Sequence, residues 1–373
     1  MVKRTRILFT IPNFITAGSG REMFNIIEGL DKIFFDPIIA VQQAGGQLYD
    51  EIIAKGYTIV EHKFIEESQH GLANKLRAAG KNSQFFKQYN IDIWQSFHWS
   101  SDFTEALTAL WCGAKYVYVK KNMNWNRKAW KVKSFLARAI IARNKTLVNG
   151  AFNNWLYKAK THFITGAVDA NRFQPGNSNF RNSLDIPAEI KIVLCVAQLI
   201  KIKDQLTLIK AIAKTENTYL VLVGAMRDEE YLQEVKDLVS KLKLEDRVQL
   251  HGYGNDTAHL VNGSDVFVLS TSKEGGHEEG CPVALLEAMA CGGACIASNV
   301  AGSNDLIIDN KTGLLFEPGN DTQLAEQITR IISDKQLAQN LGTAARKKVL
   351  AEHTLPQELA AFTRVYKQLA GIA

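Results

Sequence analysis

The sequence contains little proline and no long hydrophobic run. Only 7 of its 373 residues are proline and 46% are apolar, which is the composition of an ordered globular protein rather than a disordered one. No stretch approaches the ~18–20 consecutive apolar residues that a membrane-spanning helix needs, and the apolar run near the N-terminus lacks the small-residue cleavage site of a signal peptide. We therefore expect a cytoplasmic chain, and its length suggests two domains.

Cysteine is also scarce. The five cysteines are odd in number and include no C-x-x-C pair, which disfavours both a disulfide framework and a zinc site. We expect them to be reduced and mostly buried, as small apolar side chains. They are Cys112, Cys195, Cys281, Cys291 and Cys295.

Acidic residues are absent from one long stretch, residues 106–168. This stretch contains twelve lysines and arginines, whereas the net charge of the whole chain is +6, so the rest of the chain is net acidic. A field of one sign attracts an anionic partner. All six tryptophans lie within the stretch or just before it, at positions 94, 99, 111, 125, 130 and 155.

The basic stretch predicts contact with an anionic membrane. A basic amphipathic helix can lie on such a surface, and here the apolar side chains of Val132, Phe135, Leu136, Ala139 and Ile140 share a helical face flanked by Arg127, Lys131 and Arg138. We expect peripheral membrane contact through residues 115–160; the alternative is a core-facing helix with a solvated flank. Nucleic acid is not an expected partner, because the chain contains no recognised nucleic-acid-binding module.

Short apolar runs alternate with helical stretches, which is typical of parallel sheets covered by helices. The first series is 7–10, 37–41, 57–60, 91–95, 116–119, 146–148 and 162–164. The second series is 190–196, 219–223, 248–251, 266–269, 294–297 and 313–316. The polar stretch 174–189 between them suggests an interdomain linker.

These series predict an α/β fold of two doubly wound Rossmann-like domains facing across a cleft. The first domain would span residues 1–170 and be completed by a C-terminal helix at about 356–373, and the second would span residues 171–355. Ligands of such sheets bind beyond the carboxyl ends of the strands, so we expect one substrate to be held by each domain.

The most informative segment is residues 278–293, EEGCPVALLEAMACGG. Pro282 suits the first position of a helix and the glycines at 292 and 293 suit its end. Glu287 is the one polar side chain between them, and a buried carboxylate is costly unless it is paired or hydrogen-bonded. It either pairs with a buried cation or, together with Glu279, reaches a ligand lying across the helix N-terminus, where backbone N–H groups attract phosphate.

The pattern E-G-x-P-x-x-x-x-E followed by AMACG resembles the E-x7-E signature of glycosyltransferase family 4, which has the GT-B fold. The resemblance implies that Glu279 acts at the donor-sugar hydroxyls and that Glu287 binds the nucleotide ribose. It gives further donor-binding positions to Gly280, Cys281, Pro282 and Val283.

An upstream segment, residues 196–208 (VAQLIKIKDQLTL), resembles the R-x4-K-G turn of the same family. Lys203 matches the lysine and is expected to neutralise charge on the leaving phosphate, although a surface lysine is the alternative. Gln198 stands where arginine is common and Asp204 where glycine is common, so the diphosphate site has one cation fewer than the usual pattern.

Further candidate residues of the first domain follow predicted strands. Gly18 and Gly20 precede a helix expected at 22–30, but neither a third glycine nor an acid after the second strand completes a dinucleotide-binding fingerprint. The resemblance makes them a loop near the donor phosphates, and it puts His98, after the strand at 91–95, beside the donor sugar as a catalytic residue. Asn122 is a further candidate pocket residue.

In the second domain, Gly252 and Tyr253 follow a strand in the same way, and the resemblance places them at the nucleobase.

The resemblance implies a retaining glycosyltransferase that moves a sugar from a nucleotide-diphosphate donor to a glycan or lipid-linked acceptor, in cell-surface polysaccharide synthesis. It also implies catalysis without a metal or other cofactor, and the sequence has no Asp-x-Asp triplet suited to bridging Mg²⁺ to a diphosphate. Two alternatives stay open: a nucleotide-sugar epimerase on the same fold, and a non-catalytic nucleotide-sugar-binding protein.

Overall fold

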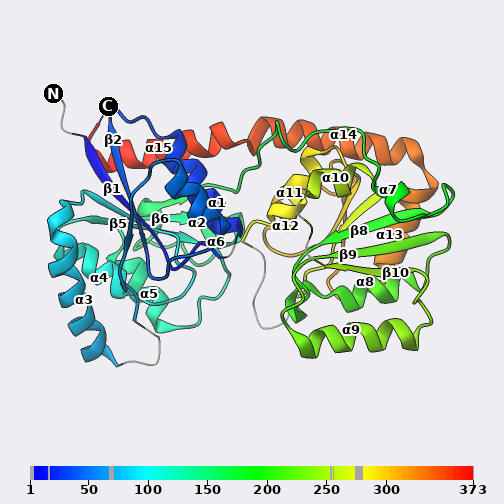
Figure 1. The fold of residues 1–373 in the computed structure, drawn as a ribbon, viewed down its shortest axis with the longest axis horizontal. Helices are drawn as coiled ribbons and strands as arrows, with labels where there is room; N and C mark the ends of the chain where they lie inside the picture. The colour runs from blue at the N-terminus through cyan, green and yellow to red at the C-terminus, as the bar shows by residue number, and fades with distance from the viewer. Residues whose placement is uncertain are drawn as a thin grey trace. The chain divides into compact units, whose positions relative to one another are not determined.

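A computed structural model describes residues 4–15, 17–66, 71–252, 254, 256–273 and 280–372 (Figure 1). The chain divides into two compact units. One comprises Met1–Thr165 together with Pro356–Ala373, and the other comprises Gly166–Leu355. This division lies within a few residues of the one expected at 170 and 356, and each unit is described by itself.

Unit 1 is built on a parallel sheet of seven strands in the order β3-β2-β1-β4-β5-β6-β7. The strands are β1 (Thr5–Ile11), β2 (Phe35–Val41), β3 (Ile59–Glu61), β4 (Ile93–Ser96), β5 (Lys115–Lys120), β6 (Ala139–Ala142) and β7 (Thr161–Phe163). The order reverses between β1 and β4, which makes the sheet doubly wound, as expected from the alternating pattern.

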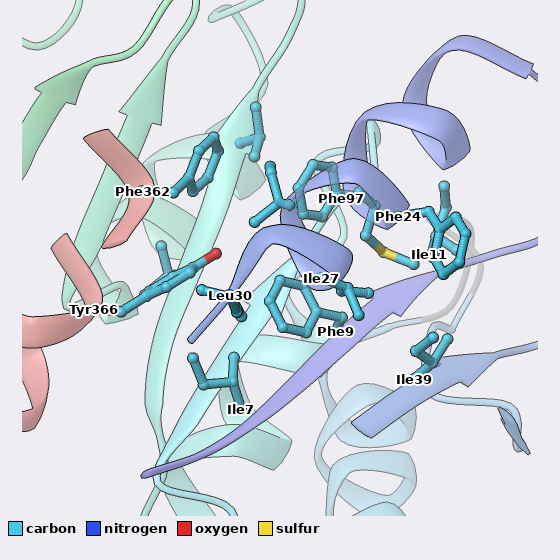
Figure 2. Close-up of a cluster of buried hydrophobic side chains, with 14 of the residues drawn as sticks. Ile7, Phe9, Ile11, Phe24, Ile27, Leu30, Ile39, Phe97, Phe362 and Tyr366 are labelled. Carbon is cyan, nitrogen blue, oxygen red and sulfur yellow. The ribbon is translucent and has the colours of Figure 1, made fainter. Parts of the chain in front are cut away.

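The helices of unit 1 pack against both faces of this sheet. They are α1 (Ala17–Gly29), α2 (Gln47–Ala54), α3 (Leu72–Phe86), α4 (Thr104–Trp111), α5 (Lys128–Leu136), α6 (Lys145–Asn149) and α15 (Leu355–Ala370). Although α15 comes from the far end of the chain, its Phe362 and Tyr366 are buried in the same apolar cluster as Phe9 and Phe97 (Figure 2). The Tyr366 hydroxyl donates a 3.0 Å hydrogen bond to the Gln95 side chain, so α15 belongs to the core of unit 1.

Arg143, just after β6, is a buried cation that joins three parts of unit 1. It pairs with Glu22 of α1 and, at 2.8 Å, with Glu358 of α15, and it donates to the carbonyls of Ile164 and Thr165. A buried charge is tolerated only with such full compensation. The arginine therefore joins α1 and α15 to residues 164–165, which follow β7.

Two expected elements of the basic stretch were wrong. The run 146–148, expected as a strand, lies in α6, because the Asn144 side chain accepts from the Leu147 backbone N–H at 2.8 Å and so caps a helix. The helical face expected to include Ala139 and Ile140 ends at Leu136, since both residues lie in the buried strand β6. Spacing on a helical wheel cannot distinguish a short buried strand from the continuation of a helix.

Unit 2 is built on a six-stranded parallel sheet in the order β10-β9-β8-β11-β12-β13. The strands are β8 (Lys191–Val196), β9 (Thr218–Val223), β10 (Val248–Gly252), β11 (Val266–Leu269), β12 (Cys295–Ser298) and β13 (Leu314–Phe316). Separate apolar clusters cover its two faces. Three of the five cysteines are buried and all five are free, as expected.

The helices of unit 2 connect these strands. They are α7 (Phe180–Ser183), α8 (Gln205–Ile212), α9 (Glu229–Lys241), α10 (Thr257–Asn262), α11 (Val283–Ala290), α12 (Ser303–Leu306), α13 (Asp321–Ser333) and α14 (Lys335–Glu352). α11 and α14 approach closely where both lack side chains: a Cβ on Gly342 would lie 2.0 Å from the Gly292 carbonyl oxygen. Gly342 thus permits a contact with the chain after α11 that any other residue at this position would block.

The stretch 174–189 is not the interdomain linker that its polar composition suggested. It lies inside unit 2 and contains α7, whose Phe180 is buried in the apolar core. Arg181 pairs with Asp265 at 2.5 Å and donates to the Ile190 carbonyl. One aromatic anchor and one ion pair are enough to order a stretch whose other residues are polar.

The compensation of Arg143 can be tested by unfolding. Arg143→Ala leaves Glu358 buried without this cation and leaves Glu22 only its pair with Lys121. It should lower the free energy of unfolding of unit 1 by about 3–5 kcal/mol. Arg21→Ala, which removes the exposed pair with Glu51, is the matched control and should cost less than about 1 kcal/mol. Tryptophan fluorescence in urea reports unit 1 alone, because all six tryptophans belong to it. Equal losses in the two variants would contradict this account.

Candidate functional site

The order of the strands locates a candidate binding site at one edge of the unit 2 sheet. β8 and β11 are neighbours, but the chain leaves them in opposite directions, so their carboxyl ends form the switch point of a doubly wound sheet. Of the predicted donor-binding residues, Gln198 and Lys203 follow β8, Gly252 ends β10, and α11 follows β11. The structure therefore brings these residues to one edge.

The connection from β8 to α8 explains why an aspartate replaces the common glycine at position 204. Asp204 has φ 46°, in the left-handed region that favours glycine and, among other residues, aspartate and asparagine. Its carboxylate also caps α8 by accepting from the backbone N–H of Thr207 at 3.2 Å and from the Thr207 hydroxyl at 2.7 Å. The departure from the family pattern thus preserves the backbone of the turn.

Lys203 is held at the end of β11. The Ser270 hydroxyl donates to the Lys203 carbonyl at 2.9 Å, and the Ser272 backbone N–H donates to the Ile202 carbonyl at 2.8 Å. Lys203 is half-buried, whereas Gln198 is exposed and contributes its carbonyl to the turn by accepting from Gln205 at 2.9 Å. The backbone of the turn at Lys203 is therefore fixed, and the side chain of Gln198 faces solvent.

Helix α11 is open on one side. Val283 is 42% exposed and Ala284 and Glu287 are half-buried, whereas Leu285, Leu286 and the residues after Glu287 are buried. Residues at i, i+1 and i+4 share a side of a helix, so an accessible stripe runs from the helix N-terminus to Glu287. The helix covers the sheet with one side only.

Glu287 is poised between its charged and neutral forms. Burial raises the pKa of its carboxyl group to about 7, while a hydrogen bond from Thr257 and the charge of Arg172 act in the opposite direction. Arg172 is exposed, so the cation that acts on Glu287 is not the buried partner of the structural alternative. The carboxylate is only partly compensated, and it has accessible space beside it.

Two buried hydroxyl groups at the same edge were missed by the sequence analysis. Ser272 follows β11 and Ser303 begins α12 after β12, and within the described part of the chain neither Oγ has a hydrogen-bond partner. A buried hydroxyl without a partner is available to a ligand oxygen. Nothing distinguishes these two from the other serines in the sequence.

The remaining predicted residues of unit 2 have the following places. Gly252 has φ 73° and accepts from the Gly224 backbone N–H at 2.7 Å, which ties the ends of β9 and β10 together. Pro282 is the N-cap of α11, and Cys281 packs against Gly166. Gly280 directly precedes them. Glu279 and Tyr253 lie outside the described residues.

A cavity of about 550 Å³ lies at the opposite, amino edge of the same sheet. Its lining includes Pro187, Thr218 and Arg247, near the starts of β8, β9 and β10. The Arg247 guanidinium donates to the carbonyls of Thr218, Ile212 and Thr215, so its donors serve the fold.

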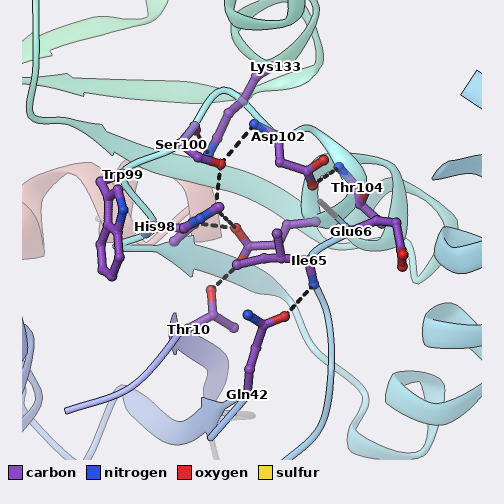
Figure 3. A network of polar contacts seen from close by, with 12 residues as sticks. Thr10, Gln42, Ile65, Glu66, His98, Trp99, Ser100, Asp102, Thr104 and Lys133 are labelled. Atoms are coloured by element: carbon purple, nitrogen blue, oxygen red, sulfur yellow. Dashed lines mark hydrogen bonds and ion pairs between the residues drawn. The ribbon is translucent and has the colours of Figure 1, made fainter. Parts of the chain in front are cut away.

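His98 lies at the carboxyl end of β4 in unit 1 and is 6% exposed. Its Nδ1 is 3.4 Å from the Ser100 hydroxyl and 3.8 Å from a carboxylate oxygen of Glu105 (Figure 3). Burial, reinforced by the charge of Lys133, lowers the pKa of His98 well below its usual value. The imidazole is therefore neutral at physiological pH.

A buried carboxylate supports the backbone of His98. Glu105 of α4 accepts from the hydroxyls of Thr10 and Ser96, at 2.5 and 2.7 Å, and from the Trp94 indole N–H at 3.3 Å. The His98 backbone N–H in turn donates to the Ser96 hydroxyl at 3.2 Å. This network links the ends of β1 and β4 to α4 and fixes the histidine in place.

The glycines expected to form a loop after β1 are instead helical. Gly18 and Gly20 lie in the first turn of α1, which begins at Ala17. A Cβ on Gly20 would lie 2.9 Å from the Phe14 ring and 3.1 Å from Leu48, whereas Gly18 has open space around it. Gly20 is thus explained by close packing rather than by a flexible turn.

Comparison with known proteins gives relatives for the second half of the chain. Residues 177–348 match the family model described as glycosyl transferases group 1. The chain is 30% identical over 197 residues to N-acetyl-alpha-D-glucosaminyl L-malate synthase of Bacillus anthracis, covering 52% of this chain and 50% of that protein. It is 31% identical over 172 residues to the lipopolysaccharide core biosynthesis glycosyltransferase LpsD of Rhizobium meliloti, covering 46% and 47%. The chain thus spans about half the length of the curated relatives it matches.

Solved structures resemble the chain over its whole length. A glycosyltransferase from Rickettsia africae superposes with a TM-score of 0.86 at 23% identity and covers 100% of both chains. HepE of Anabaena, in complex with UDP and glucose, superposes with a TM-score of 0.82 at 18% identity and covers 98% of this chain and 100% of its own. The chain therefore has the GT-B fold, and its residues 177–348 match the model of the glycosyl transferases group 1 family, in agreement with the E-x7-E resemblance.

Proposed function

We propose that the protein is a retaining glycosyltransferase that needs no metal and takes its sugar from a nucleotide-diphosphate donor. The observation that carries the proposal is the open stripe of α11, which leads from the helix N-terminus to the partly compensated carboxylate of Glu287. The match of residues 177–348 and the UDP and UDP-glucose complexes of HepE support it.

In the proposed donor site, different groups bind the ribose, the diphosphate and the base. The Glu287 carboxylate accepts hydrogen bonds from the ribose hydroxyls, and the backbone N–H groups at the start of α11, together with Lys203, face the diphosphate. No side chain caps the start of α11 in the described part of the chain. The Leu285 and Leu286 N–H groups donate to the Pro282 carbonyl, so the proposed phosphate contacts fall to the N–H groups of Val283 and Ala284. Gly252 and Tyr253 are proposed to border the base, and Ser272 and Ser303 offer hydroxyls to the donor.

The reaction we propose breaks the bond between the sugar C1 and the phosphate oxygen while the acceptor oxygen bonds C1 on the same face. The leaving phosphate takes the acceptor proton, and the sugar is oxocarbenium-like in between. Lys203 and the helix N–H groups stabilise the charge that develops on the phosphate. Glu279 and His98 are proposed to contact the donor sugar, and Glu279 is not a nucleophile.

Metal independence is part of the proposal. Among the residues that the structure describes, no group of three or more His, Cys, Asp or Glu side chains is arranged to hold a metal ion. The amide groups of α11 and the Lys203 ammonium supply the positive potential that a divalent cation supplies to a diphosphate elsewhere.

The proposed acceptor is a glycan or a lipid-linked glycan of the cell surface. Relatives include the capsular polysaccharide biosynthesis glycosyltransferase CapM of Staphylococcus aureus, 27% identical over 229 residues that cover 59% of this chain and 58% of CapM. The relatives named here are a synthase and glycosyltransferases, and none of them supports the epimerase alternative.

Peripheral membrane contact through residues 115–160 remains a proposal. Within the described residues, none of the helices is long and apolar enough to span a membrane. Several of the twelve basic residues are buried, Lys120, Lys133 and Arg143 among them, so the exposed charge is smaller than the sequence suggested. Other basic residues of the stretch are exposed, and so are Phe135 and Trp155, at 61% and 91%.

The role of Glu287 predicts a pH dependence of donor binding. Only the ionised carboxylate accepts hydrogen bonds from both ribose hydroxyls, so the donor binds the deprotonated form and its affinity should rise about tenfold between pH 6 and pH 8, through the pKa of about 7. Glu287→Gln should bind more weakly at pH 8, with a loss of about 1–3 kcal/mol, and show no such rise.

Calorimetry with a panel of UDP- and GDP-sugars measures this affinity. EDTA is present throughout. The diphosphate diesters of the donor do not titrate between pH 6 and pH 8, so a change in affinity over this range comes from the protein. A rise in affinity with pH that persists in Glu287→Gln would remove Glu287 from the site. Binding that is lost in EDTA and restored by Mg²⁺ would contradict the metal-free proposal.

The membrane proposal predicts salt-sensitive sedimentation with vesicles of phosphatidylglycerol. Changing Arg127, Lys131 and Arg138, all exposed, to glutamate should abolish binding, because each basic residue near an anionic surface contributes about 1 kcal/mol. The control changes Lys236, Lys241 and Lys335, which are exposed on unit 2, to glutamate and alters the net charge equally. Equal losses in both triple variants, or equal binding to neutral vesicles, would show that the basic face only solvates unit 1.

A further inference from the structure

Trp99 is a large aromatic side chain that unit 1 leaves partly open at the carboxyl edge of its sheet. It follows His98 directly after β4 and is 40% exposed. Its ring centroid is 5.7 Å from that of His98, at an angle of 59°. Figure 3 shows the Trp99 ring standing beside the polar network that holds His98, without a hydrogen bond of its own drawn to that network.

The backbone beneath this ring is held by two side chains, the half-buried Asn122 and the buried Lys133. The Trp99 carbonyl accepts from the Asn122 side chain at 3.0 Å, and the Ser100 carbonyl accepts from the Lys133 ammonium at 3.1 Å. The loop after β4 is thus attached at two consecutive carbonyls to the loop after β5 and to α5.

Asn122 is itself held by a second buried lysine. The Lys120 ammonium donates to the carbonyl and side-chain oxygens of Asn122, both at 2.6 Å, and to the Asn124 carbonyl at 2.8 Å. It also lies 3.7 Å from the centroid of the Trp130 ring. All three hydrogen bonds of this group go to the loop after β5.

Holding these loops is costly. Lys120 and Lys133 are both 0% exposed, and removing an ammonium group from water costs several kcal/mol before its contacts compensate. Burial lowers the pKa of both groups, that of Lys120 to about 6. Two buried lysines are therefore committed to immobilising a loop whose outward side chain is an aromatic ring.

A rigid, half-open aromatic ring suits the face of a sugar. One face of a pyranose presents C–H groups, and stacking it on an indole buries apolar surface while the sugar hydroxyls stay free for polar contacts. Because the loop is already ordered, binding would lose little conformational entropy. His98, with its neutral imidazole, lies next to the ring and can exchange a hydrogen bond with a hydroxyl at the rim of such a sugar.

We propose that Trp99 is the stacking platform for a pyranose ring of the acceptor, held in place through Asn122 and the buried Lys120 and Lys133. This inference rests on the proposed transferase function and narrows it, since the acceptor then presents a sugar, rather than only a lipid phosphate or a polyol, to unit 1.

Saturation-transfer NMR tests the platform with methyl glycosides of glucose, galactose, mannose and N-acetylglucosamine as probes, with and without UDP-glucose. At least one pyranoside should receive saturation at its ring C–H protons, and acyclic mannitol should receive none. Trp99→Ala should weaken the signal at least about tenfold, and Trp99→Phe should retain most of it because a flat apolar ring remains. Asn122→Ala should give an intermediate loss, since the ring is kept but its loop is released.

Trp111→Ala is the matched control, because Trp111 is 39% exposed in the same unit but lies at the end of α4. Its signal should equal that of the unchanged protein. Unchanged saturation in Trp99→Ala, or no saturation of any pyranoside, would overturn the proposal, and so would a loss of vesicle binding in Trp99→Ala with pyranoside binding intact. Donor binding to unit 2 is measured separately by calorimetry, so a protein that binds pyranosides through Trp99 but no nucleotide sugar would refute the donor proposal alone.

Discussion

Ionisable groups buried at the carboxyl ends of parallel strands are the constraint on which both units depend. Parallel sheets collect their ligand-facing loops at that edge, and a charge buried there costs several kcal/mol unless it is compensated. In unit 1 the compensation is extensive: Glu105 accepts three hydrogen bonds, and Arg143 has two carboxylates and two carbonyls. Arg143 thus holds α1 to α15, which lie far apart in the sequence, and Glu105 attaches α4 to the ends of β1 and β4.

Unit 2 also has buried polar groups at this edge of its sheet, and some of them are only partly compensated. Glu287 retains a pKa of about 7 because Thr257 and the exposed Arg172 offset only part of its burial. At the same edge of the sheet, Ser272 follows β11 and Ser303 begins α12. Neither hydroxyl has a hydrogen-bond partner within the described residues. Groups that the fold leaves unsatisfied are those that a ligand can satisfy. These unsatisfied groups, at the edge where parallel sheets bind their ligands, are the physical reason to propose the nucleotide sugar there.

Much of the fold could be predicted from the sequence, because buried parallel strands are short apolar runs with distinct boundaries. The expected run 266–269 coincides with β11 (Val266–Leu269), and the helix of the E-x7-E segment was placed to within a residue of α11. The pattern of apolar residues gave the wrong prediction where tertiary packing decides the structure. Ala139 and Ile140 fit a helical face as well as a strand, and a single anchor, Phe180, brings a polar stretch into a core.

The chemistry of the candidate site could be predicted only in part. Residue types and spacing identified Lys203, Glu287 and His98, but they gave no indication that Lys120 and Lys133 are buried, since a lysine is normally exposed. The role of Gly20 was misjudged for a related reason. A side chain at position 20 would clash with Phe14 and Leu48. The contact with Leu48 is a tertiary one that local sequence does not encode.

The central claim is that a nucleotide sugar binds at the carboxyl edge of the unit 2 sheet, along α11. Hydrogen–deuterium exchange with and without the nucleotide sugar that binds most tightly in the calorimetric panel tests it most directly. The account predicts slower exchange in residues 199–204 and 283–287, with no change at 184–190 and 215–219, which line the cavity at the amino edge. Protection confined to the amino edge, or binding that leaves the amides of residues 283–287 unprotected, would contradict the account.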